Sequence, residues 1–270
     1  MATADIRGQK LHFDDVGHGP PIVFGHSFLC TGEMWRAQLA ALSRTYRTIN
    51  IDLRGHGESG PADAPFSLYD AVDDVIGVLD AVGIDRAAWC GLSIGGMVAL
   101  RAAVTYPERV AALVLMDTDA GAERWLRKLR YMLMAGGARL AGIQPFIPAV
   151  SRLMFGVTTR LKKPGLVEEW EEVFASIDLP SALRCLDALM DRDSIVPRLG
   201  EIEAPCLVLV GEEDRSLPPD RSRRIHRGIR GSTYEMIRGA GHLSALEQPE
   251  EVNDAIKAFL ELAFQPKPAA

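Results

Sequence analysis

Short apolar runs recur along the chain, and most of them end at a turn residue. They span residues 21–25, 47–52, 87–91, 112–117, 206–211 and 233–237. Within a run, apolar residues follow one another without the polar alternation of a half-exposed strand. This pattern predicts strands that are covered on both faces, as the strands of a parallel sheet are.

Segments with helical spacing of apolar residues separate these runs. They lie at residues 35–42, 68–82, 94–105, 221–226 and 249–262. Strands and helices that alternate in this way predict an α/β fold with a mostly parallel, doubly wound sheet. Residues 5–17 have the pattern of a hairpin, which we expect at an antiparallel edge of that sheet.

The alternation stops between about residues 121 and 198, where helical patterns follow one another without a strand pattern. One helix is marked by Trp125, Leu126, Leu129 and Leu133, which have the spacing of an apolar helix face. Two more cover residues 166–177 and 183–190. Prolines separate or end these helices, as helix breakers do; they are Pro145, Pro148, Pro164, Pro180 and Pro197.

The chain is therefore expected to have two parts. Residues 1–120 and 199–270 form the α/β core, and residues 121–198 form an inserted helical cap, or lid. An insertion that leaves after one strand and returns before the next lies over the carboxyl ends of the parallel strands. Open α/β sheets bind their ligands at that edge.

Composition and charge exclude several classes of partner. The chain has 270 residues, 47% of them hydrophobic, and a formal net charge of −6, which is typical of a soluble globular protein. Nucleic-acid binding needs a positive footprint, so no nucleic-acid partner is expected. The basic clusters at 124–130 and 221–230 are interpreted as solvated helix faces, because their charges alternate with apolar residues.

The N-terminus and the cysteines favour the cytoplasm. Residues 1–13 lack the apolar stretch of a secretory signal, and no segment reaches the roughly 18 apolar residues of a membrane span. We therefore expect a cytoplasmic protein with no membrane partner. The four cysteines, at 30, 90, 185 and 206, have no metal-binding spacing, so free thiols and no metal site are predicted.

Ser93 is the candidate nucleophile. It lies in GLSIGG, directly after the apolar run 87–91 and before the helix that starts near Ile94. A serine at a sharp turn between a strand and a helix is typical of a nucleophile elbow. Glycines on both sides of the serine allow the close backbone approach of such a turn. The helix N-terminus also presents N–H groups to a developing negative charge.

A serine nucleophile needs a base, and the base needs an orienting group. His242 lies in a glycine loop after the run 233–237 and is the expected base, whereas His226 lies in a charged helical pattern. Asp214, three residues beyond Gly211, is the expected acid, ahead of Glu212 and Glu213. Along the chain these residues follow the order serine, acid, histidine, which is the order expected for a fold in which the nucleophile lies at such an elbow.

Two backbone N–H groups are expected to form an oxyanion hole. One belongs to Ile94, which follows the nucleophile, and the other to Phe28 in VFGHSFLCTGEMW, the loop after the run 21–25. His26 in the same loop is interpreted as a brace that holds the loop by hydrogen bonds and transfers no proton.

Taken together, these segments resemble the α/β-hydrolase fold superfamily over residues 5–262. GHSFLCTGEMW resembles its oxyanion loop, DLRGHGES a loop that many members carry after the following strand, GLSIGG the elbow, GEEDRSLPP the acid loop, and GAGHLSALEQPEEV the histidine loop. The resemblance implies an eight-stranded sheet and an acyl-enzyme mechanism with no cofactor. Many members have His-Gly where this chain has His26-Ser27, but the N–H of Phe28 remains available as a donor.

The serine at position 93 places the chain in the serine-nucleophile branch. Haloalkane dehalogenases and most epoxide hydrolases of the fold use an aspartate there. The layout most resembles small carboxylesterases and 3-oxoadipate enol-lactonase-like hydrolases. The predicted reaction is hydrolysis of a small, fairly apolar carboxylic ester, a small-molecule substrate. Alternatives are a lactone or enol-lactone hydrolase, a cofactor-free perhydrolase and a carbon–carbon bond hydrolase. An alternative of another class is a catalytically weak ligand-binding protein. No oligomeric state is predicted.

The cap is expected to select the substrate. Its candidate pocket residues are Trp125, Leu129, Phe146 and Trp170. No carboxylate clamp is evident, because the cap's basic residues fit patterns that face solvent; they are Arg124, Arg127, Arg130, Lys162 and Lys163. This favours an apolar ester over a dicarboxylate lactone.

Overall fold

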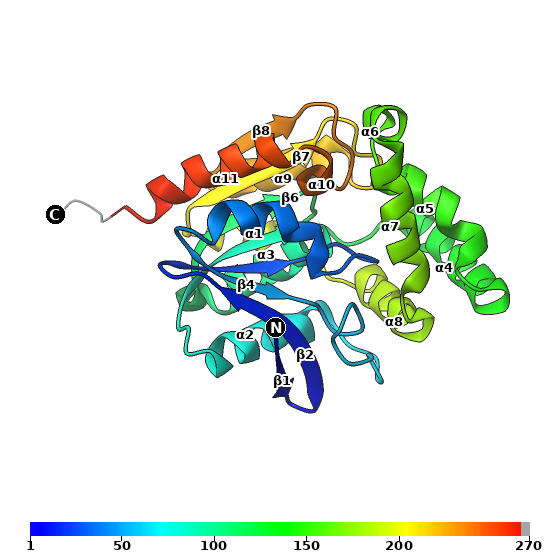
Figure 1. The fold of residues 1–270 in the computed structure, drawn as a ribbon, viewed down its shortest axis with the longest axis horizontal. Helices are drawn as coiled ribbons and strands as arrows, with labels where there is room; N and C mark the ends of the chain where they lie inside the picture. Colours follow the sequence, from blue (N-terminus) through cyan, green and yellow to red (C-terminus); the bar gives the residue numbers. More distant parts are fainter. Residues whose placement is uncertain (266–270) are drawn as a thin grey trace.

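A single eight-stranded sheet runs through the centre of the computed structural model, which describes residues 1–265 (Figure 1). The strand order is β1-β2-β4-β3-β5-β6-β7-β8. Strands β1 and β2 form an antiparallel hairpin, β2 pairs antiparallel with β4, and all other pairs are parallel. The strands are β1 (Ala2–Ile6), β2 (Gln9–Val16), β3 (Pro21–Gly25), β4 (Arg47–Ile51), β5 (Ala87–Leu92), β6 (Val110–Met116), β7 (Cys206–Gly211) and β8 (Thr233–Ile237).

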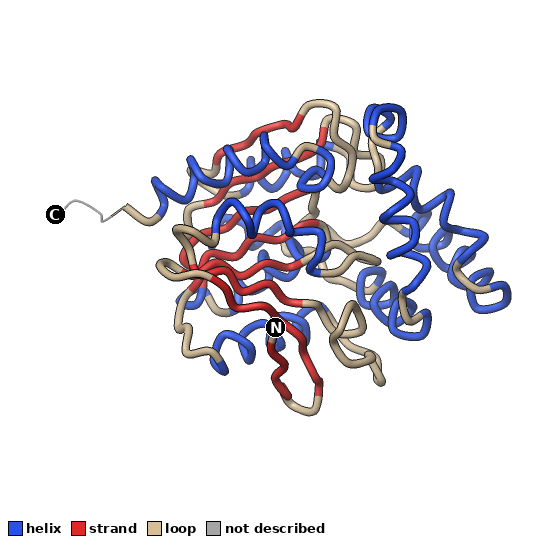
Figure 2. Tube along the Cα trace, viewed as in Figure 1, coloured by secondary structure: helices blue, strands red, loops and turns tan. Residues whose placement is uncertain are grey.

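Helices cover both faces of this sheet, as Figure 2 shows. One face is covered by α1 (Arg36–Leu42) and α11 (Pro249–Ala263). The opposite face is covered by α2 (Leu68–Ala81), α3 (Ile94–Thr105) and α9 (Pro219–Gly228). The sheet, its order and its two helical layers confirm the predicted doubly wound α/β fold. The remaining short segments are α10 (Ser244–Glu247) and the 3₁₀-helices η1 (Gly32–Trp35), η2 (Pro107–Arg109), η3 (Gln144–Phe146) and η4 (Val196–Glu201).

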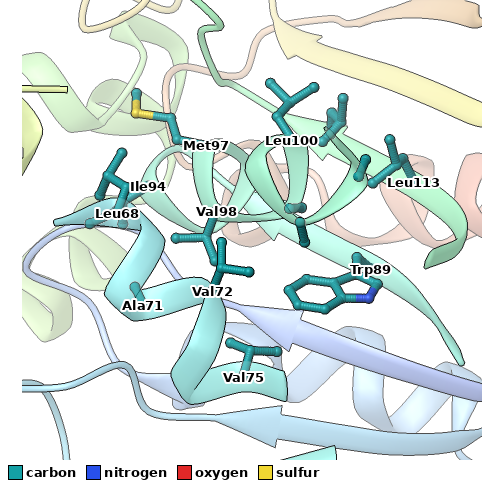
Figure 3. Close-up of a cluster of buried hydrophobic side chains, with 14 of the residues drawn as sticks. Leu68, Ala71, Val72, Val75, Trp89, Ile94, Met97, Val98, Leu100 and Leu113 are labelled. Atoms are coloured by element: carbon teal, nitrogen blue, oxygen red, sulfur yellow. The ribbon is translucent and has the colours of Figure 1, made fainter. Parts of the chain in front are cut away.

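Two hydrophobic cores account for the continuous apolar runs. Trp89 of β5 packs with α2 and α3 in one core (Figure 3), whereas its neighbours Ala88 and Cys90 belong to the core under α1 and α11. The same alternation divides Leu113 from Val114 in β6. Since side chains of a strand point alternately to its two faces, a strand covered on both sides must be apolar throughout. Strand β8 departs from this pattern, since it is an edge strand and most of it is exposed.

Five helices follow β6 and precede β7, in the segment where the sequence predicts an insertion. They are α4 (Trp125–Ala141), α5 (Ile147–Met154), α6 (Val157–Lys162), α7 (Pro164–Ser176) and α8 (Leu179–Met190). They lie together beside the carboxyl ends of the parallel strands, at the right of Figure 1. The five prolines of this segment occupy the first or second position of a helix or a 3₁₀-helix, where a missing N–H costs nothing. No helix within residues 1–265 is long and apolar enough to span a membrane.

Helix α4 is oriented differently from the sequence prediction. The positions that predicted its buried face, Trp125, Leu126, Leu129 and Leu133, are exposed. Tyr131, Met134, Ala135 and Ala138 face the rest of the protein instead. The prediction was wrong because α4 carries apolar residues on two opposite faces, and the bulkier set was taken as the inner one.

Buried ion pairs join the two ends of the helical insertion to α9. The carboxylate of Asp119 is fully buried and pairs with Arg221 and Arg224 of α9, while Glu123 pairs with Arg192 at 3.2 Å. Arg192 also donates to the carbonyl of residue 121 at 2.9 Å. The basic cluster at 221–230 is therefore partly a buried ion-pair partner, and its interpretation as a solvated face was wrong for Arg221.

Candidate active site

The turn between β5 and α3 holds Ser93 in a strained conformation. Its φ is 55°, in the left-handed region that residues with a side chain rarely occupy. The neighbouring glycines permit this turn: a Cβ on Gly91 would collide with the backbone of Gly95, and a Cβ on Gly95 would collide with Gly25 of β3. The elbow that the sequence predicts is therefore present, with Ser93 raised above the carboxyl edge of the sheet.

Three side chains from distant loops form one hydrogen-bonded line. Nε2 of His242 lies 2.9 Å from Oγ of Ser93, and Nδ1 of His242 lies 2.9 Å from Oδ2 of Asp214. All three residues are buried. They follow β5, β7 and β8, whose carboxyl ends meet at the same edge of the sheet. The structure thus brings together the three residues that the sequence places in the catalytic machinery.

The second carboxylate oxygen of Asp214 fixes the direction of this line. Oδ1 accepts a hydrogen bond from the backbone N–H of Leu217 at 2.9 Å, so Oδ2 is left to accept from Nδ1 of His242. With its proton on Nδ1, His242 presents an unprotonated Nε2 to the hydroxyl of Ser93. This is the tautomer that a general base requires.

Glu247 holds the backbone on both sides of His242. Its Oε1 accepts hydrogen bonds from the N–H of Gly241 at 2.9 Å and of Leu243 at 3.1 Å, and its Oε2 accepts from the N–H of Gly156 at 2.9 Å. The N–H of His242 itself donates to the carbonyl of Met154 at 2.9 Å. The histidine loop is thus tied to the junction of α5 and α6.

Buried negative groups surround His242. Burial opposes the charged form of His242, but the charge and hydrogen bond of Asp214, together with the charges of Asp117 and Glu247, outweigh it and raise the pKa of His242 above its ordinary 6.5. Burial, followed by the charge of Asp214, raises the pKa of Asp117 well above 3.8. Burial also raises the pKa of Glu247, against the effect of its hydrogen-bond donors.

Asp117 and Glu247 were not found from the sequence. Asp117 follows β6 with a φ of 47°, accepts from the N–H of Gly211 at 2.7 Å and also accepts from the hydroxyl of Ser244. Its position at a strand exit could have marked it. Glu247 lies in an acidic segment of the sequence that resembles a solvated helix start, and only its loop geometry distinguishes it.

The two expected oxyanion donors lie beside the elbow. Within residues 1–265, the N–H groups of Phe28 and Ile94 have no acceptor in the protein, whereas the N–H groups of Ser93 and Gly95 on either side of Ile94 do. Phe28 is held in a turn closed by the N–H of Cys30 on the carbonyl of Ser27 at 3.0 Å, with Leu29 at a φ of 64°.

His26 supports this loop as the sequence predicts. Its Nε2 accepts from the N–H of Leu53 at 2.9 Å, and its Nδ1 lies 2.8 Å from the carbonyl of Ser27. Because Nε2 accepts, the proton is on Nδ1 and the ring is neutral. Burial lowers the pKa of His26, which keeps the ring neutral.

An apolar cavity of about 120 Å³ adjoins the oxyanion loop. It is lined by Phe28 and Leu29, by the inner faces of α4, α5 and α8, and by Ser216 of the acid loop. Tyr131 and Ser216 are its only polar lining residues among those described. Both are engaged by Arg127, which donates to the hydroxyl of Tyr131 at 3.0 Å and to the carbonyl of Ser216 at 2.6 Å.

Of the four pocket candidates, the structure places only Phe146 in this cavity. Trp125 and Leu129 point to solvent from the outer face of α4, and Trp170 is buried against Phe174 in the core below. Arg127 does not face solvent as predicted, since its side chain lies behind the cavity wall. Residues 1–265 contain no group of three or more histidine, cysteine or acidic side chains arranged to hold a metal ion.

The fold and this arrangement are those of a known class of hydrolases. The Alpha/beta hydrolase family matches residues 16–255. The 3-oxoadipate enol-lactonase 2 of Acinetobacter baylyi is 28% identical to the chain over 90% of this chain and 89% of that enzyme. The chain therefore belongs to the α/β-hydrolase family.

Solved structures of similar proteins agree. A thermophilic esterase from Thermogutta terrifontis matches with a TM-score of 0.89 and 30% identity, over 94% of each chain. The enol-lactonase from Burkholderia xenovorans LB400 matches with a TM-score of 0.89 and 28% identity, over 96% of this chain and 100% of that one. The predicted superfamily is confirmed, and the chain is a hydrolase, in agreement with the expected ester-cleaving enzyme.

Proposed function

We propose that the chain is a serine hydrolase that cleaves a small, apolar carboxylic ester through an acyl-enzyme. The observation that carries this proposal is the hydrogen-bonded line from Ser93 through His242 to Asp214, with 2.9 Å at each step. A protein that only binds its ligand needs no such line, so this arrangement disfavours the catalytically weak alternative.

In the proposed reaction His242 moves one proton in each half. Its Nε2 takes the hydroxyl proton of Ser93 while Oγ attacks the ester carbonyl, and the oxyanion accepts hydrogen bonds from the N–H groups of Phe28 and Ile94. The tetrahedral intermediate then expels the alcohol, which receives the proton from His242. A water molecule gives its proton to His242, attacks the acyl carbon and releases the acid, and the proton returns to Ser93.

The lining of the cavity indicates that the part of the substrate bound there is apolar. Among the described residues its lining offers no cation, and its only polar side chains are the hydroxyl of Tyr131, which already accepts from Arg127, and the hydroxyl of Ser216. A carboxylate placed there would lose its hydration without gaining a positively charged partner. A cavity of about 120 Å³ is close in size to engineered apolar cavities of roughly 150 Å³ that bind benzene, so a group of about six carbon atoms fits. We further propose residues 121–198 as the cap that supplies this pocket.

Lactone hydrolysis is the second candidate. The enol-lactonases among the similar proteins favour it, and the same serine chemistry opens a cyclic ester. The apolar cavity supports a lactone with a hydrocarbon substituent over one that carries a carboxylate.

A fluorophosphonate probe tests the proposed chemistry. We expect it to label the native protein at Ser93, with no labelling of Ser93→Ala. Absence of labelling in folded native protein would contradict the proposal. A series of p-nitrophenyl esters from acetate to decanoate, measured beside γ-lactones with alkyl side chains, then identifies the substrate class. We expect kcat/KM to be highest near hexanoate.

A further inference from the structure

The outer face of α4 is an apolar surface without a partner. Six large side chains lie on it, between 49% and 92% exposed. They are Trp125, Leu126, Leu129, Met132, Leu133 and Leu140. They account for half of the large hydrophobic side chains that are exposed in residues 1–265. Single exposed apolar residues are ordinary, but a continuous group marks an interaction surface.

These six residues form one stripe along the helix. At about 100° of rotation per residue, they fall within an arc of about 120°. Tyr131, Met134, Ala135 and Ala138, which line the cavity, lie on the opposite side of the same helix. Figure 1 shows α4 at the outer edge of the helical insertion, away from the sheet. The stripe therefore faces outward.

Positive charge flanks the stripe. Arg130 lies at one edge of the arc and Arg139 at the other; both are exposed, and neither pairs with a carboxylate of the described residues. The wider segment has the same character, because residues 124–167 contain nine basic and no acidic residues in a chain whose net charge is −6. Five of these nine basic residues lie in α4 or directly before it.

In place of the sequence-based expectation of no membrane partner, we propose that α4 binds an anionic phospholipid surface, with its apolar stripe in the lipid and its arginines at the headgroups. A helix with an exposed apolar face that includes a tryptophan, bordered by arginines, has the composition of helices that lie in a membrane interface. Anionic headgroups supply the charge that Arg130 and Arg139 lack in the protein. A second copy of the chain is a poorer occupant, since two α4 helices paired about a two-fold axis would bring their positive charges together.

The helix would then separate the lipid surface from the cavity by its own diameter, about 10 Å. Only this link to the substrate depends on the proposed function; the binding of α4 to lipid does not. An enzyme whose pocket accepts an apolar group would, in this arrangement, work beside the phase in which apolar esters accumulate.

Trp125 provides a direct test of the binding. It is 71% exposed, whereas the other three tryptophans are buried, so a change in fluorescence on binding reports on α4. We expect a blue shift and co-sedimentation with vesicles of equal parts phosphatidylcholine and phosphatidylglycerol. Both effects should weaken with phosphatidylcholine alone and at high salt. Absence of a shift with the anionic vesicles would overturn the proposal.

Two double variants identify the contacts. Met132→Ser with Leu133→Ser, and Arg130→Gln with Arg139→Gln, should each lower the affinity for anionic vesicles by about tenfold or more. Arg44→Gln with Arg230→Gln, which removes two exposed arginines outside the insertion, is the matched control and should bind as the native protein does. Unchanged binding by the first two variants would overturn the proposal.

Two further measurements separate the alternatives. Hydrolysis of soluble p-nitrophenyl acetate should be unchanged in the Met132→Ser, Leu133→Ser variant, because neither residue lines the cavity. Lipid binding requires no turnover, so failure of the vesicle test would leave the proposed hydrolysis intact. Sedimentation velocity that showed a dimer dispersed by the same variant would identify a second copy as the occupant and contradict the lipid proposal.

Discussion

Nε2 of His242 lies 2.9 Å from Oγ of Ser93, although 149 residues separate the two in the sequence. The parallel sheet explains this proximity. Ser93 follows β5 and His242 follows β8, and parallel strands bring their carboxyl ends to one edge. The strained turn at Ser93 then directs its side chain toward the histidine loop.

The raised pKa of His242 predicts the acid limb of the pH–rate profile. His242 must be neutral to accept a proton, so activity should fall as the pH drops through its pKa. Because nearby carboxylates raise that pKa, the midpoint of the fall in kcat/KM should lie above the ordinary 6.5 of a histidine. A profile of kcat/KM against pH for a p-nitrophenyl ester measures it. A midpoint at or below 6.5 would contradict the described electrostatics.

Glu247 is expected to act as a positioning residue for His242. Glu247→Ala leaves three buried N–H groups without an acceptor, each at a cost of about 1–3 kcal/mol, and should lower both stability and kcat. Glu247→Gln keeps an acceptor for Gly241 and Leu243 and removes the charge, so it should restore much of the stability. It should also move the acid limb to lower pH, because the charge of Glu247 raises the pKa of His242.

Glu213→Gln is the matched control for this prediction. The side chain of Glu213 also ties the helical insertion to the sheet edge, through the N–H and hydroxyl of Thr158 at 2.8 and 2.6 Å. Only the backbone N–H of Glu213, which Glu213→Gln retains, bonds the histidine loop, at the carbonyl of Ala240. Its replacement should leave the acid limb in place. If Glu213→Gln and Glu247→Gln moved the limb equally, Glu247 would have no particular effect on His242.

Filling the cavity should change the preferred substrate. Ala182 of α8 is buried in the cavity wall, and Ala182→Leu occupies space that the substrate needs. At about 0.8 kcal/mol for each methylene that can no longer be buried, the ratio of kcat/KM for hexanoate to that for acetate should fall about tenfold or more. Ala141→Leu, at the exposed end of α4, should leave the ratio unchanged. Equal ratios in both variants and the native enzyme would place the acyl group elsewhere.

Asp119 is expected to hold the helical insertion to the core. Its buried carboxylate faces Arg192, Arg221 and Arg224. Asp119→Asn removes the negative charge with which these three arginines pair. Removing one partner of a buried pair costs about 3 kcal/mol or more, which urea unfolding measures. Asp220→Asn, whose carboxylate is exposed, is the control and should have little effect.

The contribution of Asp119 also has a defined pH range. Burial raises the pKa of Asp119, but the charges of the nearby arginines have the larger combined effect. The pKa of Asp119 in the folded protein therefore lies below its ordinary 3.8. Its stabilising effect should therefore be complete above that value and should decline as the pH falls through the folded pKa. A stability difference between native protein and Asp119→Asn that persisted in strong acid would contradict this assignment.

The sequence predicts the sheet and the line of Ser93, His242 and Asp214 well, for a physical reason. Strands covered on both faces must be apolar throughout, and catalytic groups must stand where those strands end. The same pattern predicts that residues 233–237 are covered on both faces, but this strand lies at the edge of the sheet and most of it is exposed. Its β-rich composition, and not its burial, identifies it as a strand.

Features that depend on packing between distant segments could not be predicted. Glu247 is indistinguishable in sequence from solvated glutamates, because its three donors come from folded loops. The orientation of α4 was missed because leucine and tryptophan on one face normally indicate burial, whereas here the smaller residues Ala135 and Ala138 face inward. Trp170 packs into the core for the same reason that it was a plausible pocket residue: it is large and apolar.

The central claim is that Ser93 carries the acyl group during turnover. Acid quenching of the enzyme during hydrolysis of p-nitrophenyl hexanoate, followed by mass analysis of its peptides, measures this directly. The account predicts that the peptide containing Ser93 gains the mass of a hexanoyl group, and that Ser93→Ala gains none and loses at least about 10³-fold in kcat. An acyl group on another residue, or native turnover by folded Ser93→Ala, would contradict it.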